Sequence, residues 1–550
     1  MHKLPEEILN YLGSLYTNEG LFDPIEEQVL PNKYGNSFFA LSCVLLYNKN
    51  KNPKWKKFAE RAIRIELNNT NNRFNINDMF RWEFKNYALL NIYDLFTDIA
   101  SELKVDLKIR LINMQNMGSF KTNWICMRGL NYLLRFKLFG DPKDLSHAEK
   151  EINMVLQRQT SDGLFYDDYE SNSFQYHSYI LALLLQYYKL KPSERLKVAL
   201  VNGLKFIKVI TAPNGDCNYF GRGQEQVFGY ISAIYALNEA SNIIDNRGEY
   251  LAYASLIFSY IRPYLAKMNI VGNENQDARV GWYKYNYLTD YLAFSSAYLL
   301  MINNEFKTKD KISKLEYECF LSDSNLFVKR TAEYFLCICA GNKSISEMPG
   351  LVYIYPNIVP CNGGPPVNIL NGSDYGHNYL GLGPAPNPLL YSEGKFVRDN
   401  DKLILIFNLK KCKVICSWFF GKNLVYQHEI FPFNKIRISP LHYASWKKLD
   451  STALCNLKGK IFTPQGVVNE YEADLIQIDN GLSITVSLFK GKKEPKKVIS
   501  SISFKSNRHR YELQKILYFI GLSLDKIIRN PKDFIYSLFY LRVRNSYKKN

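Results

Sequence analysis

Three loop-to-helix junctions in the first half of this sequence collect the residue types that acid–base chemistry uses. They span Thr122–Trp124, Asp162–His177 and Asn218–Gln226. Tyrosine, histidine and carboxyl groups can move protons, arginine and asparagine can bind a carboxylate, and tryptophan can stack on the apolar face of a ring. Junctions that meet on one face would therefore form an acid–base site for a polar, ring-shaped ligand such as a sugar.

We expect catalytic groups from these junctions at Tyr176, His177, Arg222, Asn123 and Asp168. Further candidates for substrate contacts are nine residues: Trp124, Asp162, Asp167, Glu225, Trp282, Tyr287, Asp290, Tyr375 and His377. Trp282, Tyr287 and Asp290 come from a fourth polar cluster, just before an expected helix. We expect neither a cofactor nor a metal ion, because the sequence contains no Cys-x-x-Cys pair.

Each candidate also has an ordinary structural interpretation. Asn123 and Asp162 can cap a helix or a turn. His177 can be a buried histidine with satisfied ring nitrogens, and Arg222 can hold a loop through backbone carbonyls. The recurrence of such residues at three successive junctions favours the functional interpretation.

The elements that must position these junctions are helices up to about residue 305. Apolar residues recur there at three- and four-residue spacing. The blocks are Phe38–Tyr47, Trp55–Ile65, Phe80–Ile99, Trp124–Phe139, Tyr176–Leu190, Leu196–Ile210, Val227–Ile244, Tyr250–Leu265 and Tyr287–Ile302. Helical hairpins in this number, about ten to twelve helices, predict a closed toroid, with an open solenoid as the alternative. In a toroid alternate helix ends meet on one face.

Beyond about residue 320 the apolar period changes to two, which predicts antiparallel strands. The runs are Leu326–Cys339, Leu351–Tyr355, Leu403–Leu409, Lys413–Phe419, Leu424–Ile430, Leu475–Ile478 and Leu482–Phe489. Between them Asn357–Pro388 has no period and is rich in Gly, Pro and Asn, which is typical of a functional or disordered loop. We expect its Gly363–Tyr379 part, which includes Tyr375 and His377, to reach the toroid.

The sequence thus predicts an α+β chain of three parts. A toroid domain spans 1–310, an antiparallel β-sandwich domain spans 311–505, and a basic helical tail spans 506–550. The tail has amphipathic segments at Tyr511–Ile528 and Phe534–Leu541. It can be a helix pair that docks on a domain, or it can contact an anionic membrane surface.

Composition limits the function classes. With 47% hydrophobic and 15% aromatic residues, the 550-residue chain can bury more than one core. The net charge of +18 favours acidic partners, yet no nucleic-acid-binding motif accompanies it. The ten cysteines form no disulfide framework, and Met1–Asn10 lacks the apolar stretch of a signal peptide. We therefore expect buried free thiols, no membrane-spanning helix and a cytoplasmic protein.

The junctions resemble those of polysaccharide lyases of the chondroitin AC, hyaluronate and heparinase type, which pair an α-toroid with antiparallel sheets. Asn123-Trp124 resembles their substrate-stacking patch, and Asp162 to Tyr176 resembles the stretch with their catalytic His and Tyr. Gly221-Arg222-Gly223 resembles the segment whose Arg assists that Tyr. Where the lyases have the His, however, this sequence has Asp167 or Asp168, and its own His177 follows Tyr176.

The same set also resembles a bacterial family, first known as a domain of unknown function, with members assigned as β-glucuronidases. The matching residues are Asn123-Trp124, Asp162-Gly163, Tyr176, Phe220-Gly221-Arg222 and Tyr285-Asn286. Both resemblances imply an acidic, uronic-acid-containing glycan as the partner. They differ in the reaction that they imply.

Three functions remain open at this point. A lyase would use Tyr176 as base and acid, with Arg222 favouring its phenolate and with Asn123 and His177 on the substrate carboxylate. A hydrolase would use two carboxyl groups and would bind the uronate through Arg222. The candidates, of which Asp168 with Asp162 or Glu225 is the favoured pair, are Asp162, Asp167, Asp168, Glu225 and Asp290. A non-catalytic glycan-binding protein would keep the aromatic platforms Trp124 and Trp282 alone.

Overall fold

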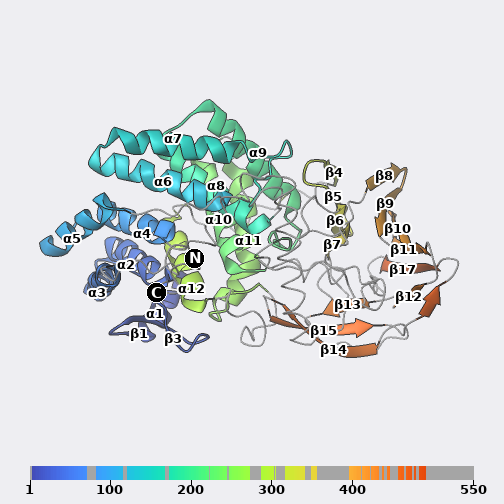
Figure 1. The fold of residues 1–550 in the computed structure, drawn as a ribbon, viewed down its shortest axis with the longest axis horizontal. Helices are drawn as coiled ribbons and strands as arrows, with labels where there is room; N and C mark the ends of the chain where they lie inside the picture. The colour runs from blue at the N-terminus through green and yellow to red at the C-terminus, as the bar shows by residue number, and fades with distance from the viewer. Residues whose placement is uncertain are drawn as a thin grey trace, which may run out of the picture.

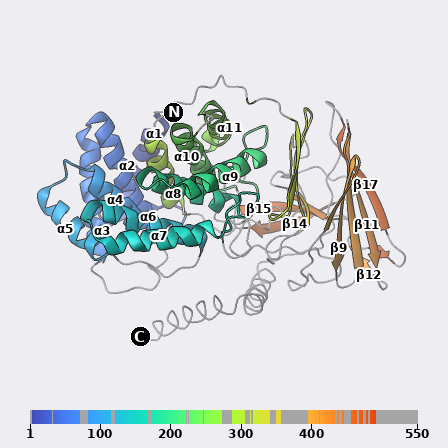
Figure 2. The same ribbon diagram turned by 90° about the horizontal axis from the view of Figure 1, so that it is seen from above.

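A computed structural model describes most of the first 340 residues and the strands that follow them. The described residues are 3–31, 33–70, 82–114, 121–167, 173–221, 223, 225–244, 247–272, 287–302, 304, 312, 316–340, 349–355, 395–409, 412–421, 423–432, 436–438, 442–445, 456–463, 466–472, 476–478 and 482–490. Helices make up one half of the molecule and strands the other, as Figures 1 and 2 show.

Six helices form a closed inner ring. They are α2 (Gly35–Asn50), α4 (Trp82–Leu95), α6 (Thr122–Phe139), α8 (Phe174–Leu190), α10 (Val227–Ile243) and α12 (Leu288–Met301). Each packs on the next, and α12 packs on α2. The ring confirms the expected toroid and rules out an open solenoid. The inner helices are apolar almost all round, as α10 is, because both of their sides face protein.

The outer helices cover this ring. They are α1 (Lys3–Ser14), α3 (Pro53–Thr70), α5 (Ser101–Ile112), α7 (Pro142–Leu156), α9 (Glu194–Ile210) and α11 (Arg247–Leu265). Side-chain caps fix where two helices begin: the Ser173 hydroxyl accepts from the Tyr176 amide at 3.3 Å, and Ser193 caps α9 likewise.

A small N-terminal sheet lies against the first and last inner helices, α2 and α12. Its strands are β1 (Tyr16–Thr17), β2 (Gly20–Asp23) and β3 (Gln28–Val29). At the end of β2, Asp23 accepts hydrogen bonds from the amide and the hydroxyl of Thr289, both at 2.9 Å, and so caps α12. The sequence predicted an almost entirely helical first part and missed this sheet, because strands of two to four residues carry no measurable period.

All strand pairs that the structure describes are antiparallel, as predicted. One sheet contains β4 (Tyr317–Leu321), β5 (Leu326–Arg330), β6 (Phe335–Ala340) and β7 (Pro349–Tyr355) in that order. A second has the order β17-β11-β10-β9-β8, from Leu482–Lys490, Asn423–Pro432, Cys412–Phe419, Lys402–Leu409 and Lys395–Asp399.

Smaller groups of strands complete the β region. They are β13 (His442–Ser445), β15 (Gly466–Glu472) and β14 (Asn456–Thr463) in one sheet, and β12 (Ile436–Ile438) with β16 (Ile476–Ile478) in another.

The first β-sheet lies between the helices and the second sheet (Figures 1 and 2). Towards the toroid it shares a core in which Phe335 and Tyr353 pack with Tyr219. Towards the second sheet, the Phe327 ring stacks on Phe420 at 5.6 Å, and Glu318 accepts two hydrogen bonds from Arg398 at 2.7 and 3.1 Å. The β4–β7 sheet is therefore packed on both sides.

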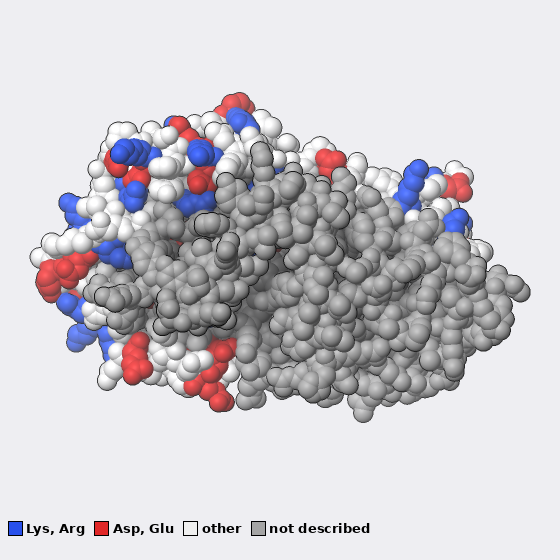
Figure 3. Space-filling model, in the orientation of Figure 1, with Lys and Arg blue, Asp and Glu red and all other residues white. Residues whose placement is uncertain are grey.

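Three further expectations concern the C-terminal tail, membrane-spanning helices and the cysteines. The expected tail, 506–550, lies outside the described residues. Within the described part of the chain, no helix has the length and apolar character that a membrane crossing requires. The seven cysteines described there are free thiols, six of them buried. On the face in Figure 3, basic and acidic side chains of the helices are interspersed rather than gathered by sign.

Candidate active site at the N-terminal ends of the inner helices

The six inner helices bring their N-terminal ends together at one end of the ring. At the start of α2, the Gly35 amide donates to Asp290 Oδ1 of α12 at 2.7 Å. Tyr34, just before α2, stacks on Phe84 of α4 with 4.4 Å between ring centroids. Phe84 in turn lies edge-on to Trp124 of α6 at 5.5 Å. These contacts join four consecutive members of the ring.

Two amide side chains complete the circle on the other side. Gln226, which immediately precedes α10, accepts from Gln175 of α8 at 3.0 Å and from the Tyr291 hydroxyl of α12 at 3.2 Å. Below this level Phe38, Tyr179, Phe228 and Phe294 pack ring on ring. The inner helices thus enclose an aromatic core, with polar groups at their N-terminal ends.

Asn123 and Tyr176 both belong to this end. Asn123 lies in the first turn of α6 with 2% of its surface exposed, and its Oδ1 has no hydrogen-bond partner among the described residues. Tyr176 lies in the first turn of α8, which packs on α6, and its ring is 6.4 Å from that of Phe228. Its phenol is close enough to Tyr34 to interact electrostatically with it. The structure therefore brings these two predicted residues to one end of the ring.

The segment that carries Arg222 packs on the first turn of the same helix. Arg222 itself lies outside the described residues. Its neighbour Gly221 forms a β-bridge with Ser173, and the Phe174 amide donates to the Phe220 carbonyl at 3.2 Å. Gly223, with φ +80°, approaches so closely that a Cβ there would be 2.0 Å from Gln175 Nε2. The backbone on both sides of Arg222 is thus fixed beside the residues that precede Tyr176.

His177 is fully buried and turned towards backbone groups. Its Nδ1 accepts from the Phe165 amide at 3.0 Å, and its Nε2 lies 3.1 Å from the Gly203 carbonyl of α9, to which it donates. Burial lowers the pKa of His177 to about 3, so the ring is neutral. With both nitrogens engaged, His177 has none left for a substrate carboxylate, and we leave it out of the candidate site.

The carboxyl groups of the second junction separate. Asp162 Oδ2 accepts from the Ser324 amide at 2.9 Å, which ties its turn to the turn between β4 and β5 rather than to the helix ends. Asp167 is buried, and its backbone carbonyl accepts from the Thr122 amide at the start of α6 at 2.9 Å. Asp167 therefore belongs to the candidate site and Asp162 to the contact with the first β-sheet.

The remaining candidates lie as follows. Trp124 and Asp290 belong to the ring of contacts described above, and Tyr287 lies under the Lys33 ammonium at 3.7 Å, between the starts of α2 and α12. Glu225 is buried beside Asp216, a carboxyl group that sequence reasoning missed. Asp168, Trp282, Tyr375 and His377, with the Gly363–Tyr379 loop, lie outside the described residues.

No cluster of metal-ligating side chains occurs among the residues with described positions. The candidate-site residues described above carry phenol, carboxyl and amide groups. Such groups can transfer protons and bind hydroxyl or carboxylate oxygens.

Comparison with known proteins yields a shared fold but no family. No family model matches the sequence, and no curated protein matches it. The chondroitin AC lyase of Streptomyces coelicolor A3, solved in complex with chondroitin sulphate, aligns with a TM-score of 0.52. The alignment covers 89% of this chain and 79% of the lyase at 10% sequence identity, so the likeness concerns the fold alone.

Two other solved structures align with about half of this chain. The GH76A α-1,6-mannanase of Salegentibacter sp. HEL1_6 has a TM-score of 0.41 at 13% identity, with 54% of this chain and 99% of that chain covered. A family 88 glycosyl hydrolase of Bacteroides vulgatus has a TM-score of 0.41 at 12% identity, with 54% and 98% covered. All three neighbours are carbohydrate-active enzymes by name, two hydrolases and one lyase.

Proposed function

We propose that this protein cleaves a uronic-acid-containing polysaccharide by β-elimination, with Tyr176 as the proton-transfer group. One observation carries the proposal. Tyr176 and Asn123 open neighbouring inner helices, and the segment with Arg222 packs on the first turn of the helix that contains Tyr176. Phenol, amide and guanidinium are the groups that this reaction needs in one place.

Each group has a defined task in the elimination. The phenolate of Tyr176 removes the proton at C5 of the uronic acid, and the resulting phenol protonates O4 as the C4–O4 bond breaks. An ordinary phenol has a pKa near 10, so a neighbouring guanidinium such as that of Arg222 is required to favour the phenolate. Asn123, together with the amides at the helix ends, binds the C6 carboxylate, whose neutralisation acidifies the C5 proton.

The convergence of helix ends supports an acidic substrate. The N-terminal end of each helix carries about half a positive charge and unpaired amide donors. Here the starts of all six inner helices meet through the contacts of Gly35, Phe84, Trp124, Gln175 and Gln226 with their neighbours. A carboxylate bound at this end is therefore favoured over a cation.

Glycoside hydrolysis is the second candidate, and a specific observation favours it. Asp167 and Asp290 are buried carboxyl groups at the same end of the ring, and hydrolysis requires two of them across the scissile bond. Asp290 accepts from a backbone amide of α2, which also suits a purely structural role. The phenol at Tyr176 has no necessary part in this second reaction.

Products distinguish the two reactions. The full-length protein is incubated with a panel of uronic-acid polysaccharides and with neutral glycans as controls. Elimination leaves a C4–C5 double bond that absorbs in the ultraviolet, whereas hydrolysis yields reducing ends without that absorbance. Ultraviolet absorbance in step with new chain ends supports the lyase. Reducing ends alone would replace it with the hydrolase, and binding without products would leave a non-catalytic glycan-binding protein.

For the architecture, we propose that the β4–β7 sheet and the β8–β11–β17 sheet are the two layers of a β-sandwich. The stacking of Phe327 on Phe420 and the contact of Phe320 with Phe396, at 6.0 Å, support this arrangement.

A further inference from the structure

A cluster of buried carboxyl and phenol groups lies next to the segment that carries Arg222. Asp216 is at the centre of this cluster. Its carboxyl oxygens accept from the Tyr230 hydroxyl of α10 at 2.8 Å, from the Tyr260 hydroxyl of α11 at 3.1 Å and from the Asn218 amide at 3.3 Å. The hydroxyl of Tyr353, in β7, interacts with the same carboxyl group and accepts from Asn214 at 3.2 Å. Helices, loop and sheet therefore meet at one side chain.

Glu225 faces the same cluster from the other end of the segment. It is 5% exposed, and its φ of +65° puts it in the left-handed region that non-glycine residues rarely adopt. Its backbone is held on both sides: its amide donates to the Asn218 carbonyl at 2.7 Å, and its carbonyl accepts from the Gly272 amide at 2.6 Å. A non-glycine residue keeps this strained backbone conformation only where its surroundings hold it, as these two hydrogen bonds do.

Asp216 and Glu225 thus lie at the two ends of the segment that carries Arg222. Asn218, inside this segment, holds it through its side chain. The Asn218 side-chain amide donates to the carbonyls of Gly223 and Gln226, both at 3.1 Å. On its outer side, Tyr219 stacks on Tyr353 with 4.2 Å between ring centroids. The described residues before Arg222 are therefore held by the toroid on one side and by the β4–β7 sheet on the other.

We propose that the Asp216–Glu225 pair, joined to Tyr353 of β7, positions the segment with Arg222 against the first turn of α8. The two carboxyl groups are positioning residues, and the β4–β7 sheet helps to position the site through Tyr353. The proposal rests on the proposed function in so far as it gives Arg222 a task beside Tyr176. The contacts that Asp216 and Glu225 make do not depend on that task.

The protonation of the pair follows from its surroundings. Burial raises the pKa of both carboxyl groups, and the charge of Asp216 raises that of Glu225 further. Asp216 receives three hydrogen bonds that stabilise its carboxylate, whereas no described hydrogen bond reaches the Glu225 carboxyl group. Of the two carboxyl groups, Glu225 therefore keeps its proton to the higher pH. The other titratable groups that face the pair are Tyr230 from α10, Tyr260 from α11, Tyr353 from β7 and Cys217 beside Asp216.

This assignment has a pH consequence with a definite sign. A carboxyl group whose pKa is raised on folding stabilises the folded form at low pH, and that contribution is lost as pH rises through its folded pKa. Ionisation of Glu225 places two like charges in a buried site. The segment should therefore become more mobile as pH rises through the raised pKa of Glu225, and Glu225→Gln should remove this change.

The test is amide hydrogen exchange of residues 217–227 in the full-length protein without substrate. Asp216→Asn and Tyr353→Phe should each speed exchange there about tenfold, which corresponds to the loss of one buried hydrogen bond. Tyr219→Phe is the matched control: it removes a hydroxyl from the same interface, but one that donates to the Ile210 carbonyl at 2.7 Å outside the cluster. In a pH series, protection of the wild type should fall as Glu225 ionises, whereas Glu225→Gln should keep its protection through the same pH range.

The outcomes separate positioning from catalysis. On a glycan that the wild type cleaves, Asp216→Asn and Tyr353→Phe should lower kcat with little change in KM. Unchanged exchange in both Asp216→Asn and Tyr353→Phe would overturn the proposal. If the wild type cleaves no glycan, the proposed reaction fails, while the exchange data still decide the positioning.

Discussion

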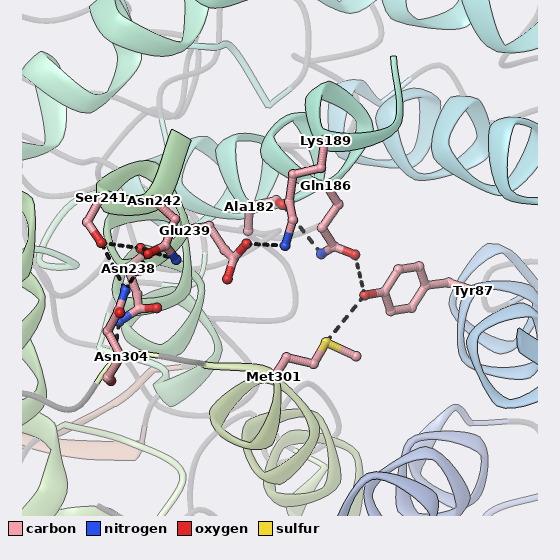
Figure 4. Close-up of polar contacts among 10 residues, drawn as sticks. All are labelled: Tyr87, Ala182, Gln186, Lys189, Asn238, Glu239, Ser241, Asn242, Met301 and Asn304. Atoms are coloured by element: carbon pink, nitrogen blue, oxygen red, sulfur yellow. Dashed lines mark hydrogen bonds and ion pairs between the residues drawn. The ribbon is translucent and has the colours of Figure 1, made fainter. Parts of the chain in front are cut away.

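The two ends of the inner ring bury polar groups in different ways. At the C-terminal end, Figure 4 shows a network of side chains that pair with one another across helices. Lys189 of α8 lies 2.5 Å from the Glu239 carboxylate of α10, and the Tyr87 hydroxyl of α4 donates to Gln186 of α8 at 2.6 Å. After α12, Asn304 donates to Ser241 and Asn242 of α10 at 3.1 and 2.8 Å.

At the N-terminal end, the contacts pass through helix starts and through a loop with strained backbone. Gly221, Gly223 and Glu225 all have positive φ within five residues, whereas the C-terminal ends of the described inner helices have single positive-φ residues, Lys51 after α2 and Gly140 after α6. Unpartnered buried atoms alone do not separate the two ends, because Asn123 Oδ1 and Glu239 Oε1 both have this property. The difference lies in backbone strain and helix polarity, and both favour the N-terminal end as the reactive one.

The largest effect that this comparison predicts comes from Tyr176→Phe. The substitution removes one oxygen, which is the atom proposed to move protons. We expect kcat to fall about a hundredfold to ten-thousandfold, or about 3–5 kcal/mol of barrier, while glycan binding persists. Turnover is measured from ultraviolet absorbance, and binding by calorimetry.

The control is Tyr179→Phe, one turn further along α8, where the hydroxyl donates to Met127 Sδ at 3.9 Å and also interacts with the Tyr298 hydroxyl. Equal losses of turnover in the two variants would argue against a specific role for Tyr176. Full turnover in Tyr176→Phe would favour the hydrolase.

The next effect concerns stability, at His177. Because burial lowers the pKa of His177 to about 3, the unfolded chain binds a proton at His177 near pH 6.5, whereas the folded chain binds it only near pH 3. Stability should therefore fall as pH drops from about 6.5 towards 3, by up to about 1.4 kcal/mol per pH unit from this group. His177→Gln should be less stable at neutral pH but should show a shallower acid limb in denaturant unfolding. An unchanged acid limb would mean that the ring is protonated in the folded protein.

The sequence predicted this architecture where periodicity is long and unambiguous. Each of the nine expected helical blocks falls on a helix. α7 was not among them because its buried apolar stripe is narrow, with Ala148, Ile152 and Val155. In α5 the exposed Val105, Ile109 and Ile112 blur the amphipathic pattern. Leu326–Cys339 was expected to form one strand, because it contains no glycine or proline to mark a turn. In the structure it forms two strands, β5 and β6.

The candidate site was predictable only in part. Helix starts identified Asn123 and Tyr176, since a toroid brings them to one face. The direction of His177 was not predictable, because adjacent residues on a helix point about 100° apart, and this ring faces α9. Asp216 was missed because its partner Tyr353 comes from β7, far along the chain, and local spacing carries no signal of such a contact.

A smaller effect is expected at the C-terminal end, from Lys189→Met. Glu239 is only 1% exposed and would lose its cation, whereas Lys189 is partly solvated and retains some screening by water. We expect a loss of about 1–3 kcal/mol of unfolding free energy, below the full cost of breaking a buried pair. Chemical denaturation measures the loss, and Glu239→Gln with Lys189→Met should recover part of it. Reduced kcat at a temperature where the variant is folded would show that this end contributes to catalysis.

The smallest effect, and the most direct comparison of the two ends, is expected from Tyr87→Phe. Tyr87 is a buried tyrosine on the ring interior like Tyr176, and its hydroxyl donates to Gln186. Loss of that hydrogen bond leaves the Gln186 oxygen without this donor and should cost about 1 kcal/mol of stability. Because the hydroxyl belongs to the C-terminal network, kcat and KM should equal those of the wild type. A tyrosine-to-phenylalanine change would then abolish turnover at one end of the ring and only lower the unfolding midpoint at the other. If Tyr87→Phe instead lost turnover as Tyr176→Phe does, buried phenols along the ring interior would act together, and the separation of a reactive from a structural end would be wrong.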